Sequence, residues 1–382
     1  MSDHCTLYGI PCSLYTAKAR SYMRKQKVSF RELSISDRHY QQEIMPKIGR
    51  MIMPVLELSS GELIQDSADI IRHFETQRPA AEPALPETPV LRALSYLFEL
   101  FGGEGLLRPA MHYRWNFDDI NLDYLRSEFE CLAPAGTDDA SYQQIFEFCS
   151  NSMRQAARSF GVSERTRALI EASYGDFLDL FSAHLRHYPY LLGSAPTLGD
   201  YALMGPLYAH LYRDPKPGQL MRQRAPLVAR WVERMNTAEE NWADHPQQQQ
   251  AAISDDKLPD TLTALMRYIA EDYLPEMVAH IKFANGWLAE RPHLDSGTNG
   301  MDDPTKRFIG KAEFSWRGTN LKTSVIPYRF YLLQELQHHF DKSTPDTQKA
   351  LRQCFKACGL DELLSLRVNR RLDRRNFLEV WI

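Results

Sequence analysis

The sequence predicts a small α/β domain, an all-helical domain and a further, mainly helical extension. Short apolar segments alternate with amphipathic ones from about Cys5 to Gln77, a proline-rich stretch follows, and the pattern after it is helical almost throughout. We therefore expect the α/β domain over residues 1–78, a linker over 79–89, the helical domain over 90–250 and the extension over 251–382.

The composition bounds the class of protein. The 382 residues are 43% hydrophobic and 25% charged with a formal net charge of -4, which is typical of a soluble globular chain. This charge gives no general attraction to nucleic acid or anionic lipid, and no apolar run is long enough for a membrane span. Six cysteines are too few for a disulfide framework, and the first residues lack a secretory signal. We expect a cytoplasmic protein with no nucleic-acid or membrane partner.

The first strand and helix lie in the segment LYGIPCSLYTAKAR, from Leu7 to Arg20. The strand ends at Tyr8, a tight turn follows, and Cys12 and Ser13 stand at the start of an amphipathic helix. A helix start offers unpaired N–H groups and the positive end of the helix dipole. A thiol or hydroxyl at this point therefore lies in a field that favours an anion.

The remaining elements of the α/β domain follow in order. A second strand is expected from Val28 to Leu33, and a third begins at Met53-Pro54. The chain turns at residues 59–61, runs back through a fourth strand, and opens a helix at Asp66-Ser67.

The linker contains four prolines in the twelve residues from Arg78 to Pro89, which excludes a helix interior or a central strand. Apolar residues at spacings of three and four then predict helices over 90–107, 145–160, 165–187, 198–212 and 227–235. The four glutamines at 247–250 indicate a polar connector.

The extension is expected to be helical over 258–289, 328–340 and 345–358, with a hairpin turning at 317–320. Cys354 and Cys358 are spaced for one helix face, but no further ligand pair accompanies them, so we expect no metal site. Five arginines from Arg367 to Arg375 are interrupted by Asp373, which favours a solvated or salt-bridged helix face over a nucleic-acid patch.

This order of elements resembles the thioredoxin-like half of a glutathione transferase. Pro54 resembles the cis-proline of that family, and Asp66-Ser67 resembles its pair that binds the γ-glutamyl end of glutathione. The segment SAPTLGDYALMGPLYAHL, Ser194 to Leu211, resembles the capping segment of the family's helical domain, with a capping box at residues 197–200. The resemblance is to bacterial serine-type, theta-like members, with a C-terminal extension. It implies a thioredoxin-like N-terminal domain, an all-α C-terminal domain and an appended α-rich extension.

The resemblance implies that the protein holds the sulfur of glutathione as a thiolate. Three side chains compete for that role. Ser13 lies where serine-type members place their hydroxyl donor, Cys12 where cysteine-type members place a thiol, and Tyr8 where tyrosine-type members place a phenol. Their structural alternatives are a helix cap for the serine, a small buried residue for the cysteine and a core aromatic for the tyrosine.

The tripeptide also has two carboxylates and an ammonium group to be bound. By resemblance, Asp66 meets the ammonium, Ser67 the γ-glutamyl carboxylate, and the Met53 backbone before Pro54 pairs with the cysteinyl amide. Lys47 and Arg50 precede the third strand and could meet the glycyl carboxylate, or could be solvated loop charges.

The electrophile pocket of the family lies between the two domains. By resemblance, its walls here are Tyr15, His112, Tyr113 and Arg114. The alternative for the run that ends in Trp115 is an aromatic anchor between domains.

The implied activity is conjugation of the glutathione thiolate to a small electrophile, with glutathione as co-substrate, no metal, and a homodimer as the default assembly. Two alternatives stay open. One is a glutathione-dependent thiol reductase using Cys12, and the other is a non-catalytic binding protein of the same fold, whose extension binds a partner.

Overall fold

The computed structural model describes residues 4–77, 83–239, 241–246, 253–303 and 305–382. Its first unit is a four-stranded sheet in the order β2-β1-β3-β4. The strands are β1 (Cys5–Tyr8), β2 (Phe30–Leu33), β3 (Val55–Glu57) and β4 (Leu63–Gln65). β1 pairs in parallel with β2 and antiparallel with β3, which pairs antiparallel with β4. The expected α/β domain is confirmed.

Helices connect the strands of this sheet. They are α1 (Leu14–Lys25), the π-helical turn η1 (Tyr40–Ile44), α2 (Met45–Ile48) and α3 (Ser67–Gln77). α1 and α3 pack against each other, and α1 also packs against the helical domain. α1 follows β1 after the loop of residues 9–13 and α3 follows β4 after Asp66. Because β1 and β4 run in the same direction, both helix N-termini lie at the same end of the sheet.

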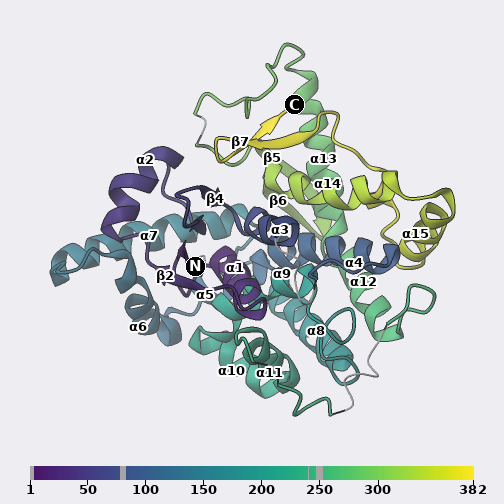
Figure 1. The fold of residues 1–382 in the computed structure, drawn as a ribbon, viewed down its shortest axis with the longest axis horizontal. Helices are drawn as coiled ribbons and strands as arrows, with labels where there is room; N and C mark the ends of the chain where they lie inside the picture. Colours follow the sequence, from purple (N-terminus) through teal and green to yellow (C-terminus); the bar gives the residue numbers. More distant parts are fainter. Residues whose placement is uncertain (1–3, 78–82, 240, 247–252, 304) are drawn as a thin grey trace.

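The helical domain follows, as expected from the apolar spacing (Figure 1). Its elements are α4 (Pro89–Leu100), η2 (Phe101–Gly105), α5 (Leu107–Trp115), α6 (Asp118–Phe129), η3 (Glu130–Leu132), α7 (Asp139–Ser159), α8 (Arg167–Leu185), α9 (Leu198–Pro206), η4 (Leu207–Tyr212), α10 (Pro215–Arg224) and α11 (Pro226–Met235). The expected capping box is present between Thr197 and Asp200 at the start of α9. Pro215 opens α10, because proline is tolerated in a first helical turn.

The extension combines helices with two hairpins. Its elements are α12 (Asp260–Asp272), α13 (Leu274–Ala289), β5 (Gly310–Trp316), β6 (Thr319–Val325), α14 (Pro327–Lys342), α15 (Pro345–Ala357), α16 (Glu362–Ser365), β7 (Leu372–Arg375) and β8 (Leu378–Trp381). The expected hairpin is present, with Trp316 paired to Thr319 across a two-residue turn. Arg317 and Gly318 in that turn have φ values of 46° and 78°, as a tight hairpin turn requires.

The prediction of a helix face for the basic tail is wrong. Arg374 and Arg375 lie in strand β7, which pairs with β8. The two strands are joined through Asn376 and Phe377, both with positive φ, 49° and 62°. This tight turn folds the tail back on itself, so the arginines follow a strand and not a helix.

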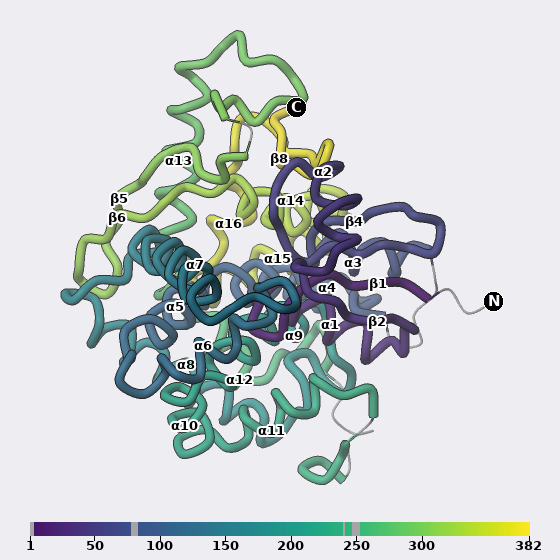
Figure 2. Tube along the Cα trace, turned by 90° about the vertical axis from the view of Figure 1, so that its left-hand side faces the viewer, coloured from purple at the N-terminus to yellow at the C-terminus, as the bar shows by residue number. Residues whose placement is uncertain are grey.

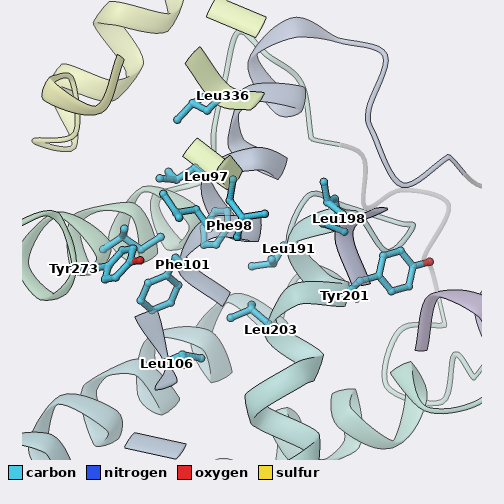
Figure 3. Close-up of a cluster of buried hydrophobic side chains, with 14 of the residues drawn as sticks. Leu97, Phe98, Phe101, Leu106, Leu191, Leu198, Tyr201, Leu203, Tyr273 and Leu336 are labelled. Carbon is cyan, nitrogen blue, oxygen red and sulfur yellow. The ribbon is translucent and has the colours of Figure 1, made fainter. Parts of the chain in front are cut away.

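One continuous core joins the helical domain to the extension. Figure 3 shows Phe98 and Phe101 from α4 and η2 beside Leu203 of α9, with Tyr273 and Leu336 of the extension at the same cluster. α14 packs along α4 and α12 along α8. Residues 78–82 of the expected linker and the expected connector at 247–250 lie outside the described residues.

The C-terminal hairpin returns to the first domain. Figure 2 shows β8 beside α2 and β4, although more than 300 residues separate them in sequence. Phe377 accepts a hydrogen bond from Arg50, and Arg374 donates to Gln65 at the end of β4.

Within the described ranges, no helix is both long and apolar enough to cross a membrane.

Candidate functional site

Three segments meet at one end of the sheet. In the strand register, Tyr8 lies opposite Val55 and Val55 lies opposite Gln65. The next residues along are the loop from residue 9 to 13, the Met53-Pro54 peptide and Asp66-Ser67. The Met53-Pro54 peptide is cis, as the resemblance implies. The Asp66 N–H donates to the Pro54 carbonyl at 3.3 Å, so the fold brings these predicted residues together.

Ser13 is the N-cap of α1. Its Oγ accepts hydrogen bonds from the Thr16 N–H at 3.3 Å and from the Thr16 hydroxyl at 3.0 Å. A hydroxyl has two acceptor lone pairs and one hydrogen to donate. Both lone pairs are therefore used, and no described residue accepts the hydrogen. The side chain is partly exposed at a helix N-terminus, which suits a donor to an anion.

Cys12 lies one residue earlier in a different environment. The residue is only 3% exposed and packs with Ile10, Met111 and Trp115. Burial raises the pKa of its thiol, because a thiolate loses solvation in an apolar cluster. Arg114 donates to the Cys12 carbonyl at 3.2 Å and so holds the loop in place.

Tyr8 is fully buried, and its hydroxyl is hydrogen-bonded within the sheet. That hydroxyl donates to Glu57 of β3 at 2.9 Å, and the rings of His39 and Tyr40 lie beside it. Burial and the Glu57 carboxylate raise the pKa of Tyr8. Its single hydrogen is already committed to a carboxylate.

Asp66 and Ser67 stand at the start of α3. Asp66 has a φ of 93°, a strained conformation of the kind that clusters at ligand clamps. Its carboxylate accepts from the Ala68 N–H and from the hydroxyl of Tyr328, both at 2.9 Å. The Ser67 hydroxyl is fully buried and has no hydrogen-bond partner in the part of the chain that the structure describes. An unpartnered buried hydroxyl is costly unless a ligand satisfies it.

The two predicted cations before β3 differ. Lys47 is exposed on α2. Arg50 is half-buried and lies within electrostatic reach of Asp66, and its Nη2 donates to the Phe377 carbonyl at 2.7 Å. Burial and the neighbouring Arg307 lower the pKa of Arg50.

The predicted pocket residues separate into two places. The Tyr15 hydroxyl donates to Glu104 at 2.7 Å, and its ring packs edge-on against Tyr328 at the site. The other three are buried in and around α5. His112 contacts Glu171, Tyr113 stacks on Phe117, and Arg114 forms an ion pair with Asp214.

The sequence pattern missed the residues that the extension brings to this end of the sheet. Arg374 donates to Gln65 at 2.8 Å and contacts Asp69 at 2.6 Å and Glu379 at 3.2 Å. Tyr328 reaches Asp66 from the start of α14. The run of arginines was the one signal in the sequence, and it did not indicate which carboxylates those arginines would pair with.

Over the described ranges, no cluster of three or more His, Cys, Asp or Glu side chains is arranged to hold a metal ion.

Two family models match the chain. Residues 7–83 match the glutathione S-transferase N-terminal domain, and residues 173–239 match the glutathione S-transferase C-terminal domain. No curated protein matches the chain.

Solved structures give a further comparison. The β-etherase LigF from Sphingobium sp. strain SYK-6 is 16% identical, with 62% of this chain and 95% of that chain covered and a TM-score of 0.45. The glutathione transferase GSTFuA3 from Phanerochaete chrysosporium is 13% identical, with 63% and 99% covered and a TM-score of 0.44. Rice GST1, solved in complex with glutathione, is 15% identical, with 61% and 86% covered and a TM-score of 0.39.

Proposed function

We propose that this chain, which belongs to the glutathione S-transferase family, binds glutathione at the end of its sheet and adds the sulfur to a small electrophile. The observation that carries the proposal is the Ser13 hydroxyl. Both of its lone pairs accept from Thr16, so its hydrogen is available to a sulfur anion at the start of α1.

The energetic requirement on Ser13 is modest. A cysteine-like thiol has a pKa near ~8.5, so only about 3% is thiolate at neutral pH. A downward shift of ~2 units corresponds to about 2.7 kcal/mol and makes the thiolate the majority form. One charge-assisted hydrogen bond together with the dipole of α1 is of that size.

The rest of the tripeptide is assigned to the converging segments. Asp66 meets the ammonium group, and the orphan Ser67 hydroxyl meets the γ-glutamyl carboxylate at the start of α3. The backbone of Met53, before the cis peptide to Pro54, pairs with the cysteinyl amide. Arg50, and at longer reach the exposed Lys47, serve the glycyl carboxylate.

The electrophile pocket is the next part of the proposal. Tyr15 faces it, because its ring lies beside Tyr328 near the start of α1. Arg114 supports it from α5 through the Cys12 carbonyl. His112 and Tyr113 stand behind Arg114 on the same helix, packed against Glu171 and Phe117. This chemistry belongs in the cytoplasm, where glutathione is abundant.

Replacing Ser13 with alanine tests the proposal. We expect kcat/KM for glutathione and an aryl halide to fall by at most roughly 30-fold at pH 7. The thiolate fraction falls by about that much when the whole shift of ~2 units is lost, and by less when the dipole of α1 keeps part of it. The difference in kcat/KM between wild type and Ser13→Ala should become smaller toward pH 9, where the thiol of glutathione ionises without help from the protein.

Matched controls separate catalysis from helix capping. Thr344 caps α15 by accepting from the Thr347 N–H at 3.3 Å, the same geometry as Ser13 with Thr16. Thr344→Ala should lower the free energy of unfolding by about 1 kcal/mol, as loss of the Ser13 cap should, and it should leave turnover intact. Tyr8→Phe should also leave turnover intact. Equal rates for wild type and Ser13→Ala would remove the hydroxyl from the mechanism.

The resemblance also implies a homodimer. In this chain α14 covers α4, and Tyr331 and Glu335 of α14 contact Arg72 of α3. A dimer would therefore use a face other than this one. Sedimentation equilibrium tests the assembly, since one chain has a mass of 44.1 kDa.

A further inference from the structure

The geometry points to a carboxylate-binding site shared between the first domain and the extension, in which Arg307 binds one of the two carboxylates of glutathione beside the group already assigned to it, Arg50 or Ser67. This inference rests on the proposed function and deepens it. It makes the extension part of the ligand site and Arg307 a specificity-determining residue.

Contacts from the extension already surround the start of α3. Tyr328 donates to the Asp66 carboxylate at 2.9 Å, and Arg374 lies 3.8 Å from the same carboxylate. On the other side, Arg50 donates to the carbonyl of Phe377 in the C-terminal hairpin. The predicted glutathione site is thus enclosed by residues from the far end of the chain.

Arg307 enters this enclosure just before β5. The Ile309 N–H donates to the Val325 carbonyl, so the chain before β5 runs beside the start of α14, where Tyr328 stands. Arg307 interacts electrostatically with Glu379, Tyr15, Glu104 and Asp66. It therefore lies within electrostatic reach of the first turn of α1 and of Asp66 before α3, where the tripeptide is expected.

Arg307 is half-buried, and its ion pairing differs from that of three other buried or half-buried arginines. Arg114, Arg329 and Arg374 each have a carboxylate oxygen within 2.7 Å. Among the described residues, Arg307 has no carboxylate within the 4.0 Å limit of an ion pair, and its Nε is buried without a hydrogen bond. Glu379, Glu104 and Asp66 interact with its charge from beyond that distance, so Arg307 lacks only the direct carboxylate contact that the fold gives the other three.

Arg50 adds a second unused cation. Its described polar contact is the backbone carbonyl of Phe377, its Nε is buried without a hydrogen bond, and the described chain gives it no carboxylate in ion-pair range. Arg307 is close enough to repel it. The orphan hydroxyl of Ser67 lies at the same end of the sheet. Guanidinium groups and a hydroxyl with no acceptor are donors that the two carboxylates of glutathione can take up.

Arg307→Gln tests the inference by calorimetric titration with glutathione. We expect the Kd to rise about 10- to 100-fold, the size of a lost charge-assisted hydrogen bond, while Arg307→Lys, which keeps the charge, recovers part of the loss. Arg224→Gln is the matched control, because Arg224 is an exposed arginine paired with Asp179, and it should stay within twofold of wild type. Unchanged or tighter binding of glutathione by Arg307→Gln would overturn the inference. Tighter binding would mean that the Arg307 side chain occupies the space of the ligand and competes with it.

Two analogues separate the loss of a direct ligand contact from a general loss of binding in the variant. Glutathione amidated at the glycyl carboxylate, and glutathione amidated at the γ-glutamyl α-carboxylate, are titrated against the wild-type protein and both Arg307 variants. One amide should bind wild type at least tenfold more weakly than glutathione, and that difference should shrink to under threefold in Arg307→Gln. If neither amide weakens wild-type binding, or if both losses persist in full in the variant, Arg307 binds no ligand carboxylate.

The outcomes separate this inference from the proposed function. If wild type binds no glutathione at millimolar ligand, both fail. If wild type binds, and Ser13→Ala loses turnover while Arg307→Gln binds normally, only the role of Arg307 fails.

Discussion

At the start of α1, Ser13 and Cys12 are neighbours in sequence but lie in different environments. The serine is partly exposed and keeps a hydrogen to donate, whereas the cysteine is buried in an apolar cluster that raises the pKa of its thiol. The sequence could not separate them, because both are small polar residues at a helix start. The direction of each side chain depends on what packs against the loop.

A thiol-trapping experiment tests this distinction. We expect native protein incubated with oxidised glutathione to form no mixed disulfide at Cys12, because burial keeps its thiol protonated and inaccessible. Mass spectrometry of proteolytic peptides measures the modification, and protein unfolded in urea is the positive control. A Cys12 peptide modified as fully in native as in unfolded protein would revive the reductase alternative.

Among the elements, the turn between α8 and α9 is held from two sides. The Leu191 N–H donates to Asp200, and the Leu191 carbonyl faces His184 Nε2, both at 3.0 Å. The other nitrogen of His184 contacts Thr261 of α12 at 2.9 Å. The turn, the capping box of α9 and the extension are therefore linked through one buried imidazole.

This imidazole makes stability depend on pH. Burial lowers the pKa of His184 from 6.5 to about 4, so the unfolded chain binds a proton more readily than the folded one. The stability is fully present above pH 6.5 and is lost as pH falls toward 4, by up to about 3 kcal/mol for this group. We expect urea titrations to show a weaker fall over that range in His184→Gln than in wild type.

The control for that experiment is His338→Gln, an exposed histidine on α14, which should keep the wild-type slope. Asp200 acts in the opposite direction. Burial raises its pKa to about 6, so its contribution is greatest at low pH and is lost as pH rises toward 6. The comparison between variants isolates His184, and identical slopes for wild type and His184→Gln would contradict the assignment.

Across the whole molecule, a buried ionic network joins all three parts. Arg329 of α14 contacts Glu104 at 3.2 Å and Glu276 at 2.7 Å, and Glu276 also pairs with Arg108 of α5 at 2.6 Å. Tyr15 of α1 donates to Glu104. The four charged residues are each at most 4% exposed, so the network is sealed from water.

Removing the central cation should therefore be costly. We expect Arg329→Met to lower the free energy of unfolding by about 3–5 kcal/mol, because two buried carboxylates lose a partner. Urea denaturation measures the loss. Arg224→Gln breaks an exposed pair and should cost less than about 1 kcal/mol. A loss as small as that for Arg329→Met would mean that the carboxylates take up protons or water at little cost.

The sequence predicts a domain boundary near residue 250, between the helical domain and the extension. The helices on either side of it share one apolar core, since α12 packs on α8 and α14 on α4. Periodicity identified these helices, because it reports which face of a helix is apolar. It does not report which helix covers that face.

The sequence alone determined the local elements: the strand, turn and helix that present Ser13, the hairpin at Arg317-Gly318 and the cap at Thr197. These depend on residues a few positions apart, whose spacing and turn chemistry can be read directly. Only the tertiary structure decided what reaches the site, since Tyr328 meets Asp66 across 262 positions. From the sequence alone, an arginine such as Arg307 or Arg374 is expected to be solvated. Its burial and its ion pairs depend on the segments that pack around it, and the segment that carries the charge does not determine them.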